Sequence, residues 1–416
     1  MIAKDPQLQD KDHDELFNHE LISDLRLKTI LFQTPTFAKN AYKHLRLHYD
    51  KFKNSTHFLI LFVKVLHKLR EYEDSLEILK NLLIMLPNNA LVKQYVKKNE
   101  EVLFVLNNDI KEEEKRLSML RKEQIHYKYD GVKPPDDILI YFQSEQLSQL
   151  KQEIKTSKHL KNFSIILEKM KREWSIYLGD IEGVYTLSKN TTRDLINLGI
   201  LEDIILHDNK DPILSLSTNG DREARAVEIR SILHDQMVTL NHLYSIIKER
   251  KLELSNDLLF KIHSLLLRTA SFSATPDGEI ILVRTNKFKN IPNTVIRDDG
   301  LYHLWALPSV VQSELNILYE KFDNLLKMNV APEVLATWFH MNFIKIHPFQ
   351  DGNGRVARTI CSLIFIYHGL LPLVVPTYEK NIYLEHIQKG LFGNTEPLLN
   401  YFVEKQLELW NRFINQ

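Results

Sequence analysis

Apolar residues recur at helical spacing through almost the whole chain, and few residues interrupt that pattern. Only 12 glycines and 14 prolines occur in 416 residues. Because these two residues most disfavour a helix interior, their scarcity favours helices. The longest apolar stretches, near residues 60 and 365, are too short or too interrupted to cross a bilayer, which takes about 20 apolar residues. We therefore predict an all-α protein without a membrane span.

Charge and cysteine content bear on the expected partners and cellular compartment of the protein. The 54 Lys and Arg residues balance 54 Asp and Glu residues, so net charge gives no reason to expect nucleic acid or an acidic membrane as a partner. The single cysteine, Cys361, lies in an apolar run and cannot form an internal disulfide. The polar N-terminal segment lacks the apolar stretch of a secretory signal. We expect a cytoplasmic or nuclear protein that binds neither nucleic acid nor a membrane.

The N-terminal part of the chain contains a helical hairpin. In residues 57–90, two amphipathic segments meet at REYED, and the second ends at a Pro-Asn-Asn turn. Tyr72, Leu76 and Pro87 resemble the second helix of a tetratricopeptide repeat, and an ordinary helical hairpin is the alternative. We predict that residues 1–110 form a tetratricopeptide-like module that recruits protein partners, since one repeat cannot bury its own apolar face.

The rest of the chain divides at turns and polar stretches. Residues 100–130 are typical of a long charged helix, and GVKPP (131–135) marks a turn. β-Branched residues and Asn-rich turns in 279–304 predict a short hairpin. We expect four further regions: a helical connector (111–180), supporting or regulatory helices (181–254), a catalytic domain (255–405) and the end of a C-terminal helix (406–416).

The segment HPFQDGNGRVAR (347–358) joins two predicted helices. Residues 331–346 have helical spacing, and the apolar run that follows the segment predicts a buried central helix ending at Gly369. The Gly-Asn-Gly sequence starts this second helix, where free backbone amides attract anions. Gly352 and Gly354 allow the backbone to approach a phosphate closely, since neither has a Cβ. The connection is therefore suited to bind phosphate groups.

The side chains of this segment supply the remaining chemistry. Arg355 and Arg358 lie in the first turn of the second helix, where guanidinium groups can bind phosphate oxygens in pairs. Asp351 is a hard oxygen ligand for a Mg²⁺ ion that bridges phosphates. His347 has a side chain that can accept a proton near neutral pH. Together these groups fit nucleotidyl or phosphoryl transfer to a hydroxyl.

The same segment resembles the Fic signature, H-x-F-x-[DE]-G-N-G-R-x-x-R, and matches each of its fixed positions. The resemblance implies a Fic-type helical catalytic domain with a β-hairpin flap. It also implies transfer of AMP from ATP, with Mg²⁺ or Mn²⁺, to a Ser, Thr or Tyr hydroxyl of a protein substrate. The roles it implies are a general base (His347), a loop anchor (Phe349), a metal ligand (Asp351), phosphate contacts (Gly352, Asn353, Gly354, Arg355) and a contact to the outermost phosphate (Arg358).

Two further parts of the resemblance concern the adenine and the target. Tyr383 falls where the family often has an aromatic residue near the base, while Leu391 stands where relatives often place an asparagine. The predicted hairpin near 280–297 falls at the family's flap, which binds the backbone of the target by strand addition. We place its tip at Thr285, Asn286 and Lys287.

A regulatory glutamate is also implied. Many Fic proteins carry a helix with the pattern [ST]-x-x-x-E-[GN], whose glutamate pairs with the last arginine of the signature and displaces the outermost phosphate. Glu182 and Gly183 match the end of this pattern, although Leu178 replaces the Ser or Thr. We expect Glu182 to pair with Arg358. The alternative is that Glu182 only begins or ends a surface helix.

Three other functions remain open at this point. The same site could remove AMP from a modified protein, with a glutamate orienting the attacking water. The protein could also be an interaction scaffold that holds a nucleotide without transferring it. A phosphotransferase is disfavoured, because Doc-type relatives usually have lysine where Arg355 stands. The protein could also form a homodimer, which the sequence neither requires nor excludes.

Overall fold

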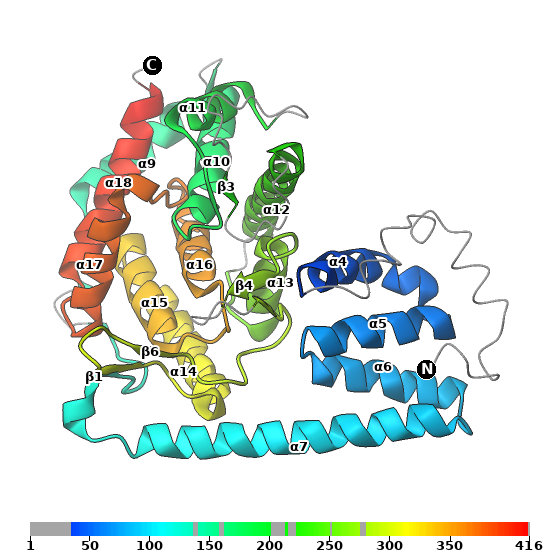
Figure 1. Ribbon diagram of the computed structural model, residues 1–416. Coiled ribbons are helices and arrows are strands. Elements are labelled where there is room, and N and C mark those ends of the chain that lie inside the picture. Colours follow the sequence, from blue (N-terminus) through cyan, green and yellow to red (C-terminus); the bar gives the residue numbers. More distant parts are fainter. Residues whose placement is uncertain are drawn as a thin grey trace. The chain divides into compact units, whose positions relative to one another are not determined.

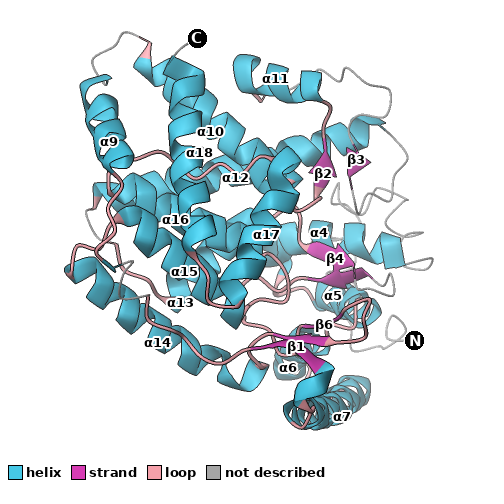
Figure 2. Ribbon diagram, turned by 90° about the vertical axis from the view of Figure 1, so that its left-hand side faces the viewer, coloured by secondary structure: helices cyan, strands magenta, loops and turns pink. Residues whose placement is uncertain are grey.

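The computed structural model describes residues 35–135, 140–157, 162–200, 213–214, 222–249, 252–274 and 280–414. Within these residues helices predominate, as the sequence predicts, and the strands are short (Figure 1, Figure 2). The chain divides into two compact units, Met1–Ser118 with Phe272–Leu282, and Met119–Ser271 with Val283–Gln416. No described helix has the length and apolarity needed to cross a membrane.

The first unit contains the predicted helical hairpin. Ser55 caps its first helix by accepting a hydrogen bond from the Phe58 amide, and the second helix ends just before Pro87. The tetratricopeptide resemblance itself stays a prediction, and residues 1–34 lie outside the described residues. The elements of this unit are α4 (Pro35–Phe52), α5 (Thr56–Lys68), α6 (Tyr72–Met85), α7 (Ala90–Ser118) and the antiparallel strands β4 (Phe272–Ala274) and β5 (Ile280–Leu282).

The long charged helix is shorter than the sequence predicts. It ends at Ser118, and the chain continues through a 3₁₀ turn, η2 (Lys122–Gln124), into strand β1 (Ile125–Lys128). The prediction of helix up to residue 130 was wrong because the β-branched and aromatic residues of β1 pair with a strand far away in the sequence.

The second unit holds the signature segment. Ser188 and Ser255 cap two of its helices with their side-chain oxygens, and Pro308 and Pro332 occupy first turns. Its helices are α9 (Glu145–Ser157), α10 (Phe163–Asp180), α11 (Lys189–Leu198), α12 (Arg222–Lys248), α13 (Asn256–Leu266), α14 (Pro308–Lys327), α15 (Pro332–Ile346), α16 (Asn353–Tyr367), η3 (Thr377–Glu379), α17 (Lys380–Leu391) and α18 (Glu396–Ile414).

Helices α15 and α16 form the centre of this unit. They lie side by side, with α10, α12 and α13 packed against α16 and α18 packed against α15 (Figure 1). Nearly every residue of both helices is buried, including Cys361 and Phe365 at 0% exposure. The predicted buried central helix is therefore confirmed, and the segment between these two helices has a rigid support at each end.

A small sheet lies beside this pair of helices. Its order is β1-β7-β6, with β6 (Thr294–Ile296) antiparallel and β1 parallel to the central strand β7 (Tyr302–Leu304). Val295 and Ile296 on the outer strand are 52% and 62% exposed. Two further strands, β2 (Tyr185–Thr186) and β3 (Ile213–Leu214), pair separately.

A short β-hairpin is present within 279–304, as predicted, and it is formed by β6 and β7. Strands β5 and β6 do not pair with each other across Thr285, Asn286 and Lys287. Strand β5 pairs with β4 and strand β6 pairs with β7, so these three residues lie in the connection between two hairpins. The physical reason is the position of the turn residues. Pro292 interrupts any continuous strand, whereas Gly300, at φ 78°, supplies the left-handed position that closes the β6–β7 turn.

Candidate active site

The connection between α15 and α16 is shaped by two left-handed residues. His347 ends α15 at φ 51° and ψ 58°, and Gly352 caps α16 at φ 84° and ψ 5°. A Cβ on Gly352 would also lie 2.9 Å from the Leu267 side chain, so both backbone angle and space require glycine. This geometry directs the free amides at the start of α16 toward one side of the loop, where an anion can bind.

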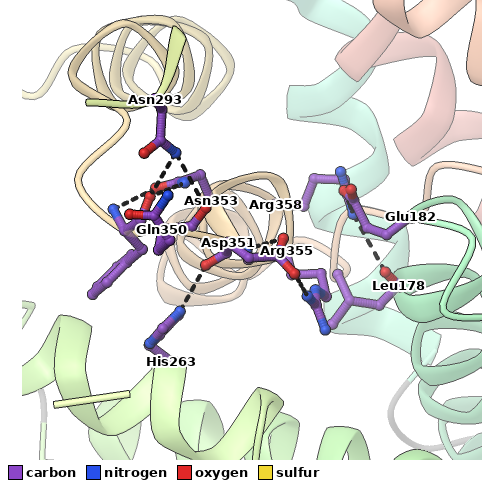
Figure 3. Close-up of polar contacts among 11 residues, drawn as sticks. Leu178, Glu182, His263, Asn293, Gln350, Asp351, Asn353, Arg355 and Arg358 are labelled. Carbon is purple, nitrogen blue, oxygen red and sulfur yellow. Dashed lines mark hydrogen bonds and ion pairs between the residues drawn. The ribbon is translucent and has the colours of Figure 1, made fainter. Parts of the chain in front are cut away.

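The side chain of Asn353 holds the loop closed. Its Oδ1 accepts a hydrogen bond from the Phe349 amide at 2.9 Å, and its Nδ2 donates to the Phe349 carbonyl at 2.8 Å. Asn293 adds hydrogen bonds from its Nδ2 to the carbonyls of Phe349 and Gln350 (Figure 3). Both polar atoms of the Asn353 amide are engaged in this way, so its side chain fixes the conformation of the loop.

Two buried guanidinium groups lie at the start of α16. Arg355 is 3% exposed and donates to Asp351 Oδ2 at 3.3 Å, and Arg358 is 2% exposed. Among the described residues, Nε and Nη1 of Arg355 and Nε of Arg358 have no acceptor. A buried donor without an acceptor costs roughly 1–3 kcal/mol, so these groups are suited to a polyanionic ligand that supplies oxygens.

Glu182 forms an ion pair with one of these guanidinium groups. Its Oε1 lies 2.6 Å from Arg358 Nη2, which also donates to the Leu178 carbonyl at 3.3 Å. A Cβ on Gly354 would collide with the same carboxylate. Glu182 follows the end of α10 and reaches the first turn of α16 from the side opposite His263 and Asn293 (Figure 3). Burial alone would lower the pKa of Arg358, but the Glu182 carboxylate outweighs it and raises that pKa.

His347 has the features of a general base. Its Nδ1 lies 3.3 Å from the carbonyl oxygen of Ile344. Because a carbonyl only accepts, Nδ1 carries the proton and Nε2 keeps its lone pair. The ring is stacked on Trp305, with centroids 4.6 Å apart and an interplanar angle of 14°. Burial, followed by the nearby Lys289, lowers the pKa of His347 to about 3, so the imidazole is neutral at neutral pH.

Asp351 can supply a ligand to a cation that accompanies phosphate groups. Its side chain is 36% exposed, with Oδ1 accepting from the Gly352 amide and Oδ2 beside Arg355. The described residues contain no cluster of three or more His, Cys, Asp or Glu side chains arranged for a metal. A single carboxylate is enough for a Mg²⁺ ion that takes its other ligands from water and phosphates.

The family model that matches the chain is the Fic/DOC family, over residues 253–365. This region of the chain is similar to the Fic/DOC family. A solved Fic-domain signaling protein from Bacteroides thetaiotaomicron shares the fold, with TM-score 0.51 and 19% identity over 65% of this chain and 96% of that one.

Curated relatives carry a more specific name. Protein adenylyltransferase fic-1 of Caenorhabditis elegans is 25% identical over 107 residues, which cover 26% of this chain and 21% of that protein. Protein adenylyltransferase Fic of Aedes aegypti is 27% identical over 104 residues, which cover 23% of this chain and 21% of that protein. The chain thus spans about a fifth of the length of these relatives.

The Fic segment brings the predicted signature residues together, and the structure also gives contacts for Tyr383 and Thr285. Tyr383 is 2% exposed, and its hydroxyl lies 3.5 Å from Arg358 Nη1 and 2.7 Å from His340 Nε2. Tyr383 is therefore buried in contact with the last arginine of the signature, and its expected position near adenine stays a prediction. The Thr285 carbonyl lies near His263 and Ser264, inside the Fic domain and away from a hairpin tip.

Sequence reasoning missed two residues that position the Fic loop. His263 on α13 is stacked on Phe349 at 3.8 Å, and its Nε2 lies 2.9 Å from the Asp351 carbonyl oxygen. Lys289 is buried; its amide donates to the Pro348 carbonyl, and its Nζ lies 3.4 Å from the Ile346 carbonyl. The partners are backbone oxygens, which leave no pattern in a sequence, so neither residue had a signal that spacing could reveal.

Proposed function

We propose that this protein is a protein adenylyltransferase that transfers AMP from ATP to a Ser, Thr or Tyr hydroxyl of a target protein. The observation that carries the proposal is the combination at one helix start: buried guanidinium donors of Arg355 and Arg358 without acceptors, beside an imidazole whose Nε2 lone pair is available. The names of the curated relatives support the same reaction.

The reaction follows from this arrangement. His347 Nε2 takes the proton of the target hydroxyl while the hydroxyl oxygen forms a bond to the α-phosphorus of ATP. The bond from that phosphorus to the oxygen bridging to the β-phosphate breaks, and pyrophosphate leaves. The α16 amides, with Arg355 and Arg358, hold the β- and γ-phosphates and stabilise the charge that develops on the leaving group.

A divalent cation, Mg²⁺ or Mn²⁺, accompanies the nucleotide. Asp351 is the residue that would hold it, with phosphate oxygens and water as the other ligands. When bound, the cation offsets negative charge on the phosphates. Asp351 also pairs with Arg355, so the same carboxylate orients one of the phosphate-binding guanidinium groups.

Strand β6 is the surface that binds the target backbone. It is the outer strand of the β1-β7-β6 sheet, and its free edge offers amides and carbonyls for strand addition. The strand belongs to the hairpin that leads directly to Trp305, which contacts His347, so an added target strand is held close to the base. Contacts to the target from Thr285, Asn286 and Lys287 remain a prediction from the sequence, as does recruitment by the N-terminal helices.

Glu182 acts as a brake on this reaction. Its carboxylate pairs with the Arg358 guanidinium and fills the space next to Gly354. The outermost phosphate of ATP binds in this same place. Two anions cannot share one buried guanidinium without strong repulsion, so the carboxylate and the γ-phosphate compete. ATP binds productively only when Glu182 moves away.

A second candidate, hydrolytic removal of AMP from a modified protein, is favoured by the same residue. A carboxylate held 2.6 Å from Arg358 can orient a water molecule for attack on phosphorus. In that case replacing Glu182 by Gln abolishes release of AMP from a modified target, whereas in the first case it raises incorporation.

Labelled ATP distinguishes these functions. The wild-type chain and the Glu182→Gly variant are incubated with a cell extract and ATP labelled at either the α- or the γ-phosphate. We expect protein-bound label from the α position, stronger in the variant. Label from the γ position would instead identify a phosphotransferase. No label from either, with nucleotide still bound, would identify a nucleotide-holding scaffold.

A further inference from the structure

We propose that Trp305 is a positioning residue for His347, and that strand β1, far outside the matched Fic region, holds Trp305 in place. The inference rests on the proposed role of His347 as general base. The new element is β1 (Ile125–Lys128), which supports the base indirectly and lies more than a hundred residues before the matched region.

The His347 ring has few contacts that could fix its orientation. The contact from its Nδ1 to Ile344 is long, at 3.3 Å, and leaves the ring free to turn about that bond. Stacking on Trp305, at 4.6 Å and 14°, fixes the plane of the imidazole. The stacking on Trp305 and the Nδ1 contact to Ile344 together determine the direction in which Nε2 points.

Trp305 is held by two rings from neighbouring strands. The ring centroid of His303 on β7 lies 4.2 Å from that of Trp305, and the ring centroid of Tyr127 on β1 lies 5.9 Å from it. Tyr127 and His303 are themselves 4.7 Å apart, are register partners in the sheet and are both buried. The rings of Tyr127, His303, Trp305 and His347 therefore form one continuous series, which we call the aromatic series.

Strand β1 is fastened at its far end as well. The Tyr129 hydroxyl donates to Glu314 on α14 at 2.6 Å, and the Lys133 amide donates to Asn342 Oδ1 on α15 at 3.0 Å. The Lys133 carbonyl accepts a hydrogen bond from the Trp338 indole at 2.8 Å. Residues 125–133 thus bind both the sheet that carries Trp305 and the helix that ends at His347, which sets the distance between them.

The kinetic test uses the Glu182→Gly chain as parent. Replacing Trp305 by Leu should lower kcat by about 10- to 100-fold while the KM for ATP stays within about twofold, because the phosphate site is unchanged and only the base is misoriented. Trp305→Phe keeps an aromatic face and should recover most of the activity. Tyr141→Ala, at a residue 88% exposed, is the matched control and should leave kcat unchanged. An unaltered kcat in Trp305→Leu would overturn the proposal.

A second measurement does not depend on activity. In the wild-type chain with ¹³C-labelled histidine, the His347 Cε1–Hε1 signal is assigned by its loss in His347→Gln. We expect Tyr127→Ala, which removes a ring that the structure does not place in contact with His347, to shift or broaden this signal as Trp305→Leu does. A signal unchanged by Tyr127→Ala would overturn the role of β1. Absence of α-label from the parent chain would instead contradict the proposed function and leave this spectroscopic result to decide the inference.

Discussion

Glu182 Oε1 and Arg358 Nη2 lie 2.6 Å apart, although 176 residues separate them in the chain. The guanidinium is 2% exposed, so the arginine side of this ion pair is buried at the start of α16. In the proposed function, the Glu182 carboxylate competes with a phosphate for these donors. The relationship between these two residues therefore gives the first of the predictions that follow.

Removing the Glu182 carboxylate should release the site. We expect Glu182→Gly and Glu182→Gln to tighten ATP binding, and to raise the rate of AMP incorporation, by about 5- to 150-fold, the usual range of coupling between competing ligands. Binding is measured by calorimetry and transfer with α-labelled ATP. Glu168→Gln is a matched control on α10, where Glu168 forms an ion pair with Lys171. ATP affinity equal in all three chains would contradict the proposed competition.

Loss of the base should affect chemistry and leave binding intact. We expect His347→Ala to lower AMP transfer by about 100- to 10,000-fold in the Glu182→Gly chain, with an unchanged Kd for ATP. His368→Ala, at the other end of α16, is the control and should retain activity. Transfer within about threefold of the parent in His347→Ala would show that another group accepts the proton.

The pH dependence should reveal how far burial lowers the pKa of His347. The base acts in its neutral form, and its pKa in the folded protein is about 3 instead of the usual 6.5. At pH 5 the imidazole is therefore still neutral, and we expect kcat/KM to stay nearly constant from pH 8 down to 5 with Mg²⁺ in excess. A fall in kcat/KM centred near pH 6.5 would instead show that the His347 ring is solvated and keeps its usual pKa.

The amide of Asn353 should be needed for stability as well as for binding. Asn353→Ala leaves the Phe349 amide without its partner in a buried loop and removes one of the two hydrogen bonds to the Phe349 carbonyl, at a cost of about 1–3 kcal/mol in the free energy of unfolding. Urea denaturation followed by tryptophan fluorescence reports on this unit, since all 4 tryptophans lie in it. The exposed Asn381→Ala serves for comparison; equal stability of the two variants would refute the role of Asn353 in closing the loop.

Replacing the buried Lys289 should stabilise the protein at low pH. Burial lowers the pKa of Lys289 to about 7 from 10.5, so the folded state holds fewer protons than the unfolded state between these values. The cost of the buried charge is therefore largest below pH 7 and shrinks as pH rises from 7 to 10.5. We expect Lys289→Met to raise the free energy of unfolding by about 1–3 kcal/mol at pH 6 and by less at pH 9.

The matched control for this variant is the exposed Lys287→Met, two residues earlier in the chain. Its free energy of unfolding should follow that of the wild type at both pH values. A Lys289→Met gain that is the same at pH 6 and pH 9 would mean that apolar packing, and not removal of the charge, stabilises the variant.

Local patterns in the sequence predicted the helical class, the buried helix α16 and the loop that starts it. These features depend on residue spacing and on backbone rules that operate within a few residues. The pairing of Glu182 with Arg358 came from a resemblance and not from spacing, because no local rule connects residues so far apart. Their contact is observed, whereas its effect on ATP is part of the proposed function.

The features that sequence reasoning missed depend on contacts made across the fold. Strand β1 was read as part of a helix because its partner, β7, follows it by well over a hundred residues. The contacts of the Tyr383 hydroxyl with His340 and Arg358 join three different helices, so residue spacing could not reveal them. His263 acts through the carbonyl of Asp351, and a backbone oxygen gives no clue to its partner in the sequence.

The matched family region begins at residue 253, yet Glu182 and Tyr127 both precede it. Mutations in these upstream segments can therefore change how readily the site opens, or how well its imidazole is aimed, while every residue of the HPFQDGNGRVAR segment stays the same. Regulation by the upstream segments can therefore differ between related proteins that share the same signature segment. An isolated 253–365 fragment would accordingly be a poor guide to how the whole chain behaves.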